Sequence, residues 1–221
     1  MDKKNLEKLT YEMLEAIGED ADREGLKDTP KRIPVVYGEI FSGVGKKPED
    51  IIKKVFTVEK NNIVIEKNID FYSMCEHDLL PFFGQIHVAY IPDGKVLGFG
   101  DIIKITEIYS RRLQIQERLT NEICDAVIDM TKCQGVMVIV KARHLCIEMK
   151  GSRKTNSEIV TSAVRGIFEK EECRCQIPKK TYTKWFDYGI IKQSVAVRTR
   201  RAGDFIVIDE CHRSIYNLWK Q

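Results

Sequence analysis

The chain of 221 residues is long enough for one domain, or one domain with an appendage, and can bury a sizeable core. Hydrophobic residues make up 43% and charged residues 31%, a balance ordinary for a globular protein, and the net charge of +3 is uninformative as a total. No stretch approaches the ~18 apolar residues that a membrane span requires. Residues 1–4 lead into a polar helical pattern and not into a signal peptide. We therefore expect a cytoplasmic protein with no membrane partner.

Apolar residues at helical or alternating spacing predict the secondary structure in chain order. The pattern of helices, two strands, two helices and two strands favours an α+β fold, with an antiparallel sheet and helices on one face. A change in composition near residues 173–180 suggests a domain of residues 1–175 and a basic appendage of residues 176–221. The predicted helices cover residues 6–17, 29–42, 101–110 and 119–132, and the predicted strands cover residues 62–67, 85–92, 136–149 and 158–168.

The seven cysteines are odd in number and follow no secretion signal, which favours metal binding or buried thiols over disulfides. Cys75 and Asp78 are three residues apart in a predicted loop. His144 and Cys146 are two apart on a predicted strand, so we expect them to share a face. Two thiolates and a third ligand suit a zinc ion with an open position for water, and His144 beside it would carry protons.

The residue pattern alone leaves structural alternatives open. A cysteine on a strand is commonly part of the core, and a histidine there is commonly held by structural hydrogen bonds. Gln116 and Glu117 would equally suit the solvated start of a helix. The spacing of the cysteines is not that of a closed zinc finger.

Longer motifs resemble the GTP cyclohydrolase I family. The resemblance runs from about residue 6 to residue 168, with several motifs in the same order. The motifs are Thr-Pro-Lys-Arg at residues 29–32, Tyr-Ser-Met-Cys-Glu-His at 72–77, Leu-Leu-Pro-Phe at 79–82, His-Val-Ala-Tyr-Ile-Pro at 87–92, Ser-Arg-Arg-Leu-Gln-Ile-Gln-Glu-Arg-Leu-Thr at 110–120 and Thr-Ser-Ala-Val-Arg-Gly-Ile-Phe at 161–168.

This resemblance implies the tunnelling fold, in which subunits assemble around a ring, here as a homodecamer of two pentamers. It implies conversion of GTP and water to 7,8-dihydroneopterin triphosphate and formate, the reaction that opens folate or pterin synthesis. Carried over by motif, the zinc ligands are Cys75, Asp78 and Cys146, and the catalytic histidines are His144 and His77. The guanine-binding pair falls on Gln116 and Glu117, and the residues left to hold the triphosphate are Arg32, Lys104 and Lys150.

The sequence departs from the family pattern at two places. Asp78 replaces a zinc-binding histidine; carboxylate oxygen is an accepted zinc ligand, but it makes the site more anionic. Gly100 and Asp101 replace the Ser-Lys pair that helps to hold the triphosphate, and both Lys104 and Lys150 replace arginines. We expect zinc binding to persist and the triphosphate to be held weakly. The alternatives are a divergent tunnelling-fold enzyme acting on another purine or pterin, and a degenerate non-catalytic paralogue.

The appendage resembles part of the C-terminal domain of tRNA lysidine synthetase over residues 180–188 and 197–206. None of that enzyme's catalytic ATP-binding region is present. The resemblance is interpreted first as a fused or truncated gene remnant, with a basic RNA-contacting appendage, coincidence or a family-specific extension as the alternatives. We expect no nucleic-acid partner.

Overall fold

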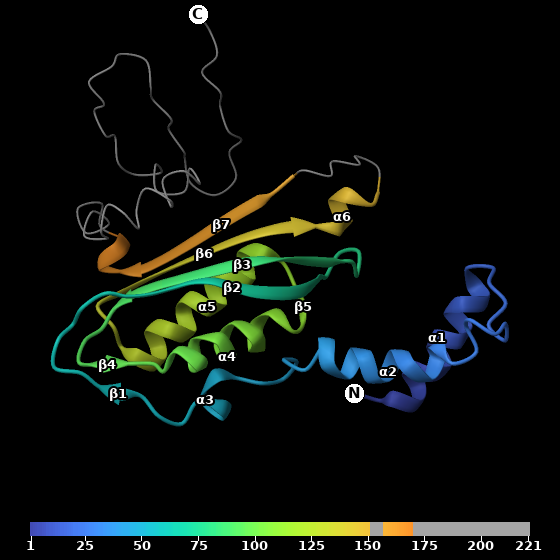
Figure 1. The fold of residues 1–221 in the computed structure, drawn as a ribbon, viewed down its shortest axis with the longest axis horizontal. Helices are drawn as coiled ribbons and strands as arrows, with labels where there is room; N and C mark the ends of the chain where they lie inside the picture. The colour runs from blue at the N-terminus through green and yellow to red at the C-terminus, as the bar shows by residue number, and fades with distance from the viewer. Residues whose placement is uncertain (151–156, 170–221) are drawn as a thin grey trace, which may run out of the picture.

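The computed structural model describes residues 1–150 and 157–169. In Figure 1, α4 and α5 lie along one face of a sheet, while α1 and α2 form a separate pair of helices to one side. The appendage of residues 176–221, with its resemblance to tRNA lysidine synthetase, lies outside the described residues. The helices described are α1 (Lys3–Ala16), α2 (Thr29–Ile40), α3 (Pro48–Ile51), α4 (Phe99–Ser110), α5 (Gln116–Thr131), α6 (Leu145–Glu148) and the 3₁₀ turn η1 (Ile167–Glu169).

Within the described residues, a five-stranded sheet has the order β5-β2-β3-β6-β7, and β1 and β4 form a separate two-stranded pair. The pairs β2–β3, β3–β6 and β6–β7 are antiparallel, whereas the short β5 runs parallel to β2. The expected α+β class, with an antiparallel sheet covered by helices, is confirmed for this part of the chain. The strands are β1 (Phe56–Thr57), β2 (Val64–Cys75), β3 (Pro81–Ile91), β4 (Lys95–Val96), β5 (Leu113–Gln114), β6 (Gly135–His144) and β7 (Ile159–Gly166).

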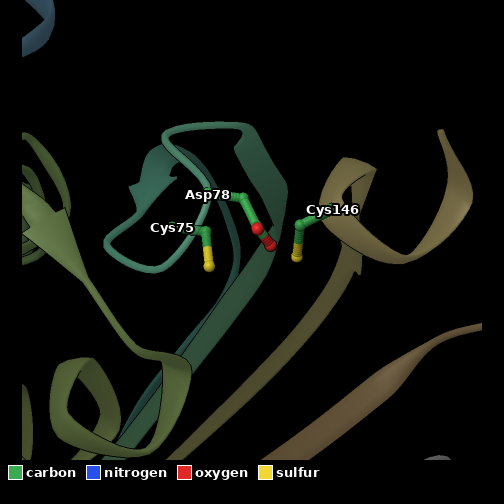
Figure 2. A group of neighbouring side chains, drawn as sticks. All are labelled: Cys75, Asp78 and Cys146. Atoms are coloured by element: carbon green, nitrogen blue, oxygen red, sulfur yellow. The ribbon is translucent and has the colours of Figure 1, made fainter. Parts of the chain in front are cut away.

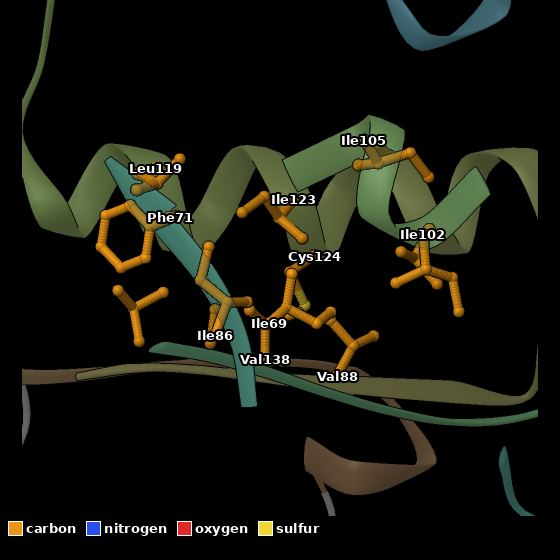
Figure 3. Packing of buried hydrophobic residues seen from close by; sticks show 14 of the residues in the cluster. Ile69, Phe71, Ile86, Val88, Ile102, Ile105, Leu119, Ile123, Cys124 and Val138 are labelled. Carbon is orange, nitrogen blue, oxygen red and sulfur yellow. The ribbon is translucent and has the colours of Figure 1, made fainter. Parts of the chain in front are cut away.

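The main core lies between the sheet and helices α4 and α5. Alternate residues of β3 and β6 point toward the helices, as the two-residue period of a strand requires. Figure 3 shows Ile86, Val88 and Val138 from the sheet packed against Ile105 and Ile123 from the two helices. This packing fixes α5 across the sheet and places its first residue near the end of β6.

A bulge in β2 interrupts its pairing with β3 between Glu66 and Ile69. Asn68 has a left-handed φ of 59°, and its N–H donates to Nδ1 of the buried His87 at 3.1 Å. Before the bulge, Glu66 pairs with Val88 and therefore faces the helix-covered core. Its Oε2 is buried and has no hydrogen-bond partner among the described residues, and burial raises the pKa of this carboxyl.

The structure corrects the bounds of three predicted strands. The strands predicted at residues 62–67 and 85–92 extend to residues 64–75 and 81–91 and form one long hairpin. The strand predicted at residues 136–149 ends at His144, and Cys146 lies in helix α6. The predicted shared strand face of His144 and Cys146 is therefore wrong, because the chain turns into a helix between them. Among the described residues, no helix combines the length and apolar character that crossing a membrane requires.

Candidate active site

Three potential metal ligands converge from two separate segments of the chain. Cys75 ends β2, Asp78 lies in the β2–β3 turn, and Cys146 lies in α6. Their ligand atoms all lie within 4.8 Å of one another, and Figure 2 shows them facing a common point. Both cysteines are buried, whereas Asp78 is exposed. The site is therefore open to solvent on its carboxylate side.

The turn that carries Cys75 and Asp78 is held by backbone hydrogen bonds. The Cys75 N–H donates to the Leu80 carbonyl, and the Leu79 N–H donates to the Cys75 carbonyl, each at 2.9 Å. Leu79 adopts a left-handed φ of 53°, which an exposed leucine tolerates at some conformational cost. The Glu76 N–H donates to the Gln114 carbonyl at 3.1 Å, which joins the turn to β5.

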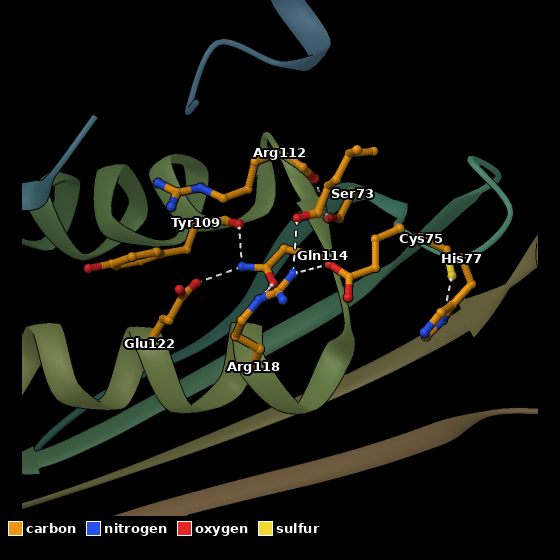
Figure 4. Close-up of polar contacts among 10 residues, drawn as sticks. Ser73, Cys75, His77, Tyr109, Arg112, Gln114, Arg118 and Glu122 are labelled. Atoms are coloured by element: carbon orange, nitrogen blue, oxygen red, sulfur yellow. Dashed lines mark hydrogen bonds and ion pairs between the residues drawn. The ribbon is translucent and has the colours of Figure 1, made fainter. Parts of the chain in front are cut away.

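A polar network, drawn in Figure 4, ties the same turn to α5. Arg118 donates to the Glu76 carboxylate and, at 2.8 Å, to the Gln114 side-chain oxygen. The Gln114 amide in turn donates to Glu122 at 2.6 Å and to the Tyr109 carbonyl at 3.1 Å. The Arg118 guanidinium holds the pKa of Glu76 below its ordinary value. The network keeps the turn in place beside the first turns of α5.

The donor set suits a zinc ion. Thiolate sulfur and carboxylate oxygen are both zinc ligands, and three protein ligands leave a fourth position open. The four cysteines that the structure describes are free, so both sulfurs are available. Burial, and then the neighbouring Cys75 sulfur, raise the pKa of the Cys146 thiol. A bound cation would oppose this effect, because it favours the thiolate.

His144 is held beside this group by a defined set of contacts. Its ring stacks on Phe82 at 4.6 Å between centroids, and its Nε2 lies 2.7 Å from Oε1 of Gln116. The Gln116 amide nitrogen donates to the carbonyls of Val140 and Ile159, each at 3.0 Å, and carbonyls only accept. Oε1 must therefore accept from His144, which places the proton on Nε2.

The same geometry leaves the other nitrogen of His144 free to accept a proton. Nδ1 lies 4.0 Å from the Cys146 sulfur and so faces the metal group. Burial lowers the pKa of His144, while the nearby Glu117 carboxylate opposes this shift. The ring is accordingly expected to be neutral at pH 7, with its basic atom toward the site.

Gln116, expected to bind guanine, lies at the buried start of α5. Its side chain is buried, and its amide group is occupied by His144 and two carbonyls, together with Thr161 Oγ1 at 3.1 Å. These contacts fix the Gln116 amide against Nε2 of His144. Glu117, its neighbour, is exposed at the start of α5 and its carboxylate is open to solvent. The exposed His77 lies in the turn, with Nδ1 3.8 Å from the Cys75 sulfur.

A sequence model of the GTP cyclohydrolase I family matches residues 6–179. The chain belongs to the GTP cyclohydrolase I family. A GTP cyclohydrolase 1 from Fusobacterium nucleatum subsp. nucleatum is 50% identical over 169 residues, which cover 76% of this chain and 90% of the relative. A GTP cyclohydrolase 1 from Clostridium kluyveri is 50% identical over 178 residues, covering 80% and 96%, and one from Clostridium perfringens is 47% identical over 172 residues, covering 78% and 93%.

One solved structure is similar to this chain at a lower level of identity than these relatives. An archaeosine synthase QueF-Like structure covers 47% of this chain and 93% of its own, with 24% identity and a TM-score of 0.39.

The three cationic residues expected to hold a triphosphate are not gathered at this family site within one chain. Arg32 lies on α2, where its side chain is exposed and pairs with Asp28 at 3.8 Å. Lys104 pairs with Asp101 at 2.8 Å in α4 and lines a cavity of about 230 Å³ that contains none of the metal group. Lys150 alone reaches the site, where its Nζ donates to Asp78 Oδ2 at 2.6 Å. The Asp78 carboxylate raises the pKa of Lys150.

Sequence reasoning missed the residues that support the family site. Phe82 stacks on His144 because the two residues are paired across β3 and β6. This pairing depends on register, which the sequence does not show. Gln114 and Arg118 are four residues apart around the start of α5, a spacing that could have suggested their contact. Their link to Glu76 joins distant segments and left no local signal.

Proposed function

We propose that the protein catalyses zinc-dependent hydrolysis and rearrangement of GTP to 7,8-dihydroneopterin triphosphate and formate, the first step of folate or pterin synthesis. Family membership supports the reaction. The single structural observation that carries the proposal is the group of Cys75, Asp78 and Cys146 beside His144, whose Nδ1 faces it.

Cys75, Asp78 and Cys146 would hold the zinc ion, and Asp78 is the exposed member of this group. A bound zinc ion supplies Lewis acidity that lowers the pKa of water toward ~7. The protein's own contribution is to keep the two sulfurs on separate, anchored segments. The hydrogen bonds of the turn hold Cys75, and the paired contact of Arg143 with Glu148, at 2.8 and 2.7 Å, closes α6 around Cys146.

His144 would first accept a proton at Nδ1 from the water that attacks C8, then pass it to the ring nitrogen of guanine, and would carry protons again during ring opening and closure. Its Nε2 stays bound to Gln116, which keeps the imidazole from rotating away. His77 would serve as a second, more mobile proton carrier at the solvent side of the turn. Glu117 would accept hydrogen bonds from N1 and N2 of guanine, a pattern that adenine cannot satisfy. Glu117, and not the buried Gln116, supplies this recognition.

The triphosphate would be held weakly. Asp101 neutralises Lys104, and Lys150 is bound to Asp78. Arg32, on a helix pair that projects from the sheet, would then serve the site of a neighbouring subunit. We expect a smaller preference for GTP over guanosine than a site with free cations would give.

A ring-shaped homodecamer of two pentamers completes the proposal. The edge strand β7 and most of the outer edge of β2 lack a partner strand among the described residues. Open edges of this kind are suited to pairing with a second copy, and a head-to-tail interface that closes gives a ring. The domain division at residue 175 and a cytoplasmic location, where thiols stay reduced, are further parts of the proposal.

The proposal is tested by incubating the purified protein with GTP and Zn²⁺ and measuring formate together with the pterin chromophore. Both products are expected in equal amounts, and Cys146→Ser should abolish them. A parallel reaction with ATP should yield neither product, since Glu117 discriminates against adenine. If the zinc-loaded protein releases formate from neither GTP nor guanosine, the proposed function is contradicted.

A further inference from the structure

The contact between Lys150 and Asp78 joins the two segments that supply the metal group. Lys150 follows α6, the helix that carries Cys146, and Asp78 belongs to the turn that also carries Cys75. The Nζ–Oδ2 distance of 2.6 Å is that of a short charge-assisted hydrogen bond. The contact therefore links the turn that carries Cys75 to the segment that follows Cys146.

The contact also balances the negative charge of the three ligands. Two thiolates and one carboxylate around a divalent ion leave one excess negative charge, which the ammonium of Lys150 balances. A carboxylate has two oxygens, so the one that binds Lys150 leaves the other for the ion. Ligating carboxylates are commonly held in this way by a second residue, which fixes their orientation.

The segment that carries Lys150 is itself anchored. Arg143 at the end of β6 makes two contacts with Glu148 of α6, and the Met149 N–H donates to the Leu145 carbonyl at 2.8 Å. Lys150 follows directly after this last bond, so its backbone position is linked to that of Cys146. A residue placed in this way can set the position of Asp78 relative to Cys146.

We infer that Lys150 is a positioning residue of the metal site, which orients and charge-balances Asp78 as a ligand, and is not primarily a phosphate-binding residue. This inference rests on the proposed zinc site. It predicts that zinc affinity depends on Lys150 only while residue 78 is a carboxylate. A neutral imidazole at position 78 has no carboxylate oxygen for Lys150 to bind and adds no negative charge to the site.

The test measures Zn²⁺ affinity by competition with a chromophoric chelator on the full chain. Lys150→Met should lower the affinity about 10- to 100-fold, the usual effect of losing such a partner, and Lys150→Arg should retain most of it. In an Asp78→His background, Lys150→Met should change the affinity less than about 2-fold. Lys8→Met, which removes the lysine of an exposed ion pair with Glu12 in α1, is the matched control and should change nothing.

Cobalt provides a second readout that does not depend on activity. Co²⁺ bound to the parent should show sulfur-to-metal absorption, and Lys150→Met should alter the ligand-field bands, because the carboxylate loses its fixed orientation. Unchanged or tighter zinc binding in Lys150→Met, with a raised KM for GTP, would overturn the inference and make Lys150 a substrate residue. A parent chain that binds no zinc would instead remove the metal site itself, and the inference with it.

Discussion

At the scale of single residues, the site is organised around the two nitrogens of His144. Gln116 accepts from Nε2 and is itself fixed by two backbone carbonyls, so the ring has one tautomer and one orientation. Stacking on Phe82 holds the ring plane. The basic Nδ1 is thereby aimed at the metal group before any substrate arrives. Such preorganisation matters because small displacements of a catalytic group are costly in rate.

Substitution of Gln116 by methionine tests this role. The side chain keeps its approximate volume but no longer accepts from His144, so kcat should fall about 10- to 100-fold while KM for GTP changes little. Steady-state kinetics on the zinc-loaded protein measure the two constants, and the thermal midpoint controls for folding. If instead KM rises and kcat is kept, Gln116 binds guanine as the family resemblance implied.

A second residue-scale prediction concerns the pH dependence of stability. Glu66 is half-buried, and burial raises the pKa of its carboxyl, so the folded state holds this proton more tightly than the unfolded state. The contribution of Glu66 to the free energy of unfolding is therefore most favourable below the ordinary pKa of a glutamate, ~4.3. It is lost as pH rises through the raised pKa of the folded state. Glu66→Gln should stabilise the fold by about 1 kcal/mol at pH 7.5, and the gain should shrink near pH 4. Urea denaturation at both pH values measures the difference, and an equal gain at both would refute the ionisation argument.

At the scale of elements, the site is made where strands end. β2 ends at Cys75, β6 ends at His144, and α5 begins at Gln116. Both β2 and β6 run antiparallel to β3, which lies between them, so they end at the same edge of the sheet. The contact of Gln116 with His144 brings the start of α5 to that edge. β3 and β6 lie close together at Gly84, where an added Cβ would lie 1.9 Å from the Lys141 carbonyl oxygen.

Gly84→Ala should therefore destabilise the protein by about 1–3 kcal/mol, because backbone and not a flexible side chain obstructs the new methyl group. Gly100→Ala is the matched control, since nothing lies within 4 Å of a Cβ there. In helix α4 that change should be neutral or stabilise by about 0.5–1 kcal/mol. Denaturation midpoints measure both, and equal effects of the two substitutions would show that the sheet adjusts freely at Gly84.

Sequence patterns found most elements but not the geometry at their ends. Helical spacing predicted α1, α2 and α5, because apolar residues recur along one face of each, and a short helix was also predicted at the position of α4. The strand predicted to continue through Cys146 was too long, because the local sequence stays apolar while the Arg143–Glu148 contact closes a helical turn. The gathering of Cys75, Asp78 and Cys146 was expected from the family resemblance and is present. The bond of Lys150 to Asp78 joins residues 72 apart and had no local signal.

At the scale of the whole molecule, the described part of a single chain leaves the edges of the sheet without partner strands and does not bring Arg32 and Lys104 to the metal group. The proposed ring would pair the edges and bring Arg32 of one copy to the site of another. Residues beyond 179 fall outside the family match and are not needed for this assembly in the proposal.

A chain cut after residue 179 should therefore form an assembly with the same number of subunits as the full chain. The parent is expected to elute as ten copies of the 25.6 kDa chain, measured by light scattering after size exclusion. The truncated chain should also form ten copies and should keep its zinc content. A smaller assembly after truncation would show that the appendage takes part in subunit contacts, and a monomeric parent would exclude the ring.

X-ray absorption at the zinc edge of the zinc-loaded parent tests the proposed metal centre most directly. Two sulfur ligands at ~2.3 Å and oxygen or nitrogen ligands at ~2.0–2.2 Å are expected. Asp78→His should keep the two sulfurs and add the scattering of one imidazole ring. A spectrum of the parent with no sulfur ligands, or with four, would contradict a site built from Cys75, Asp78 and Cys146.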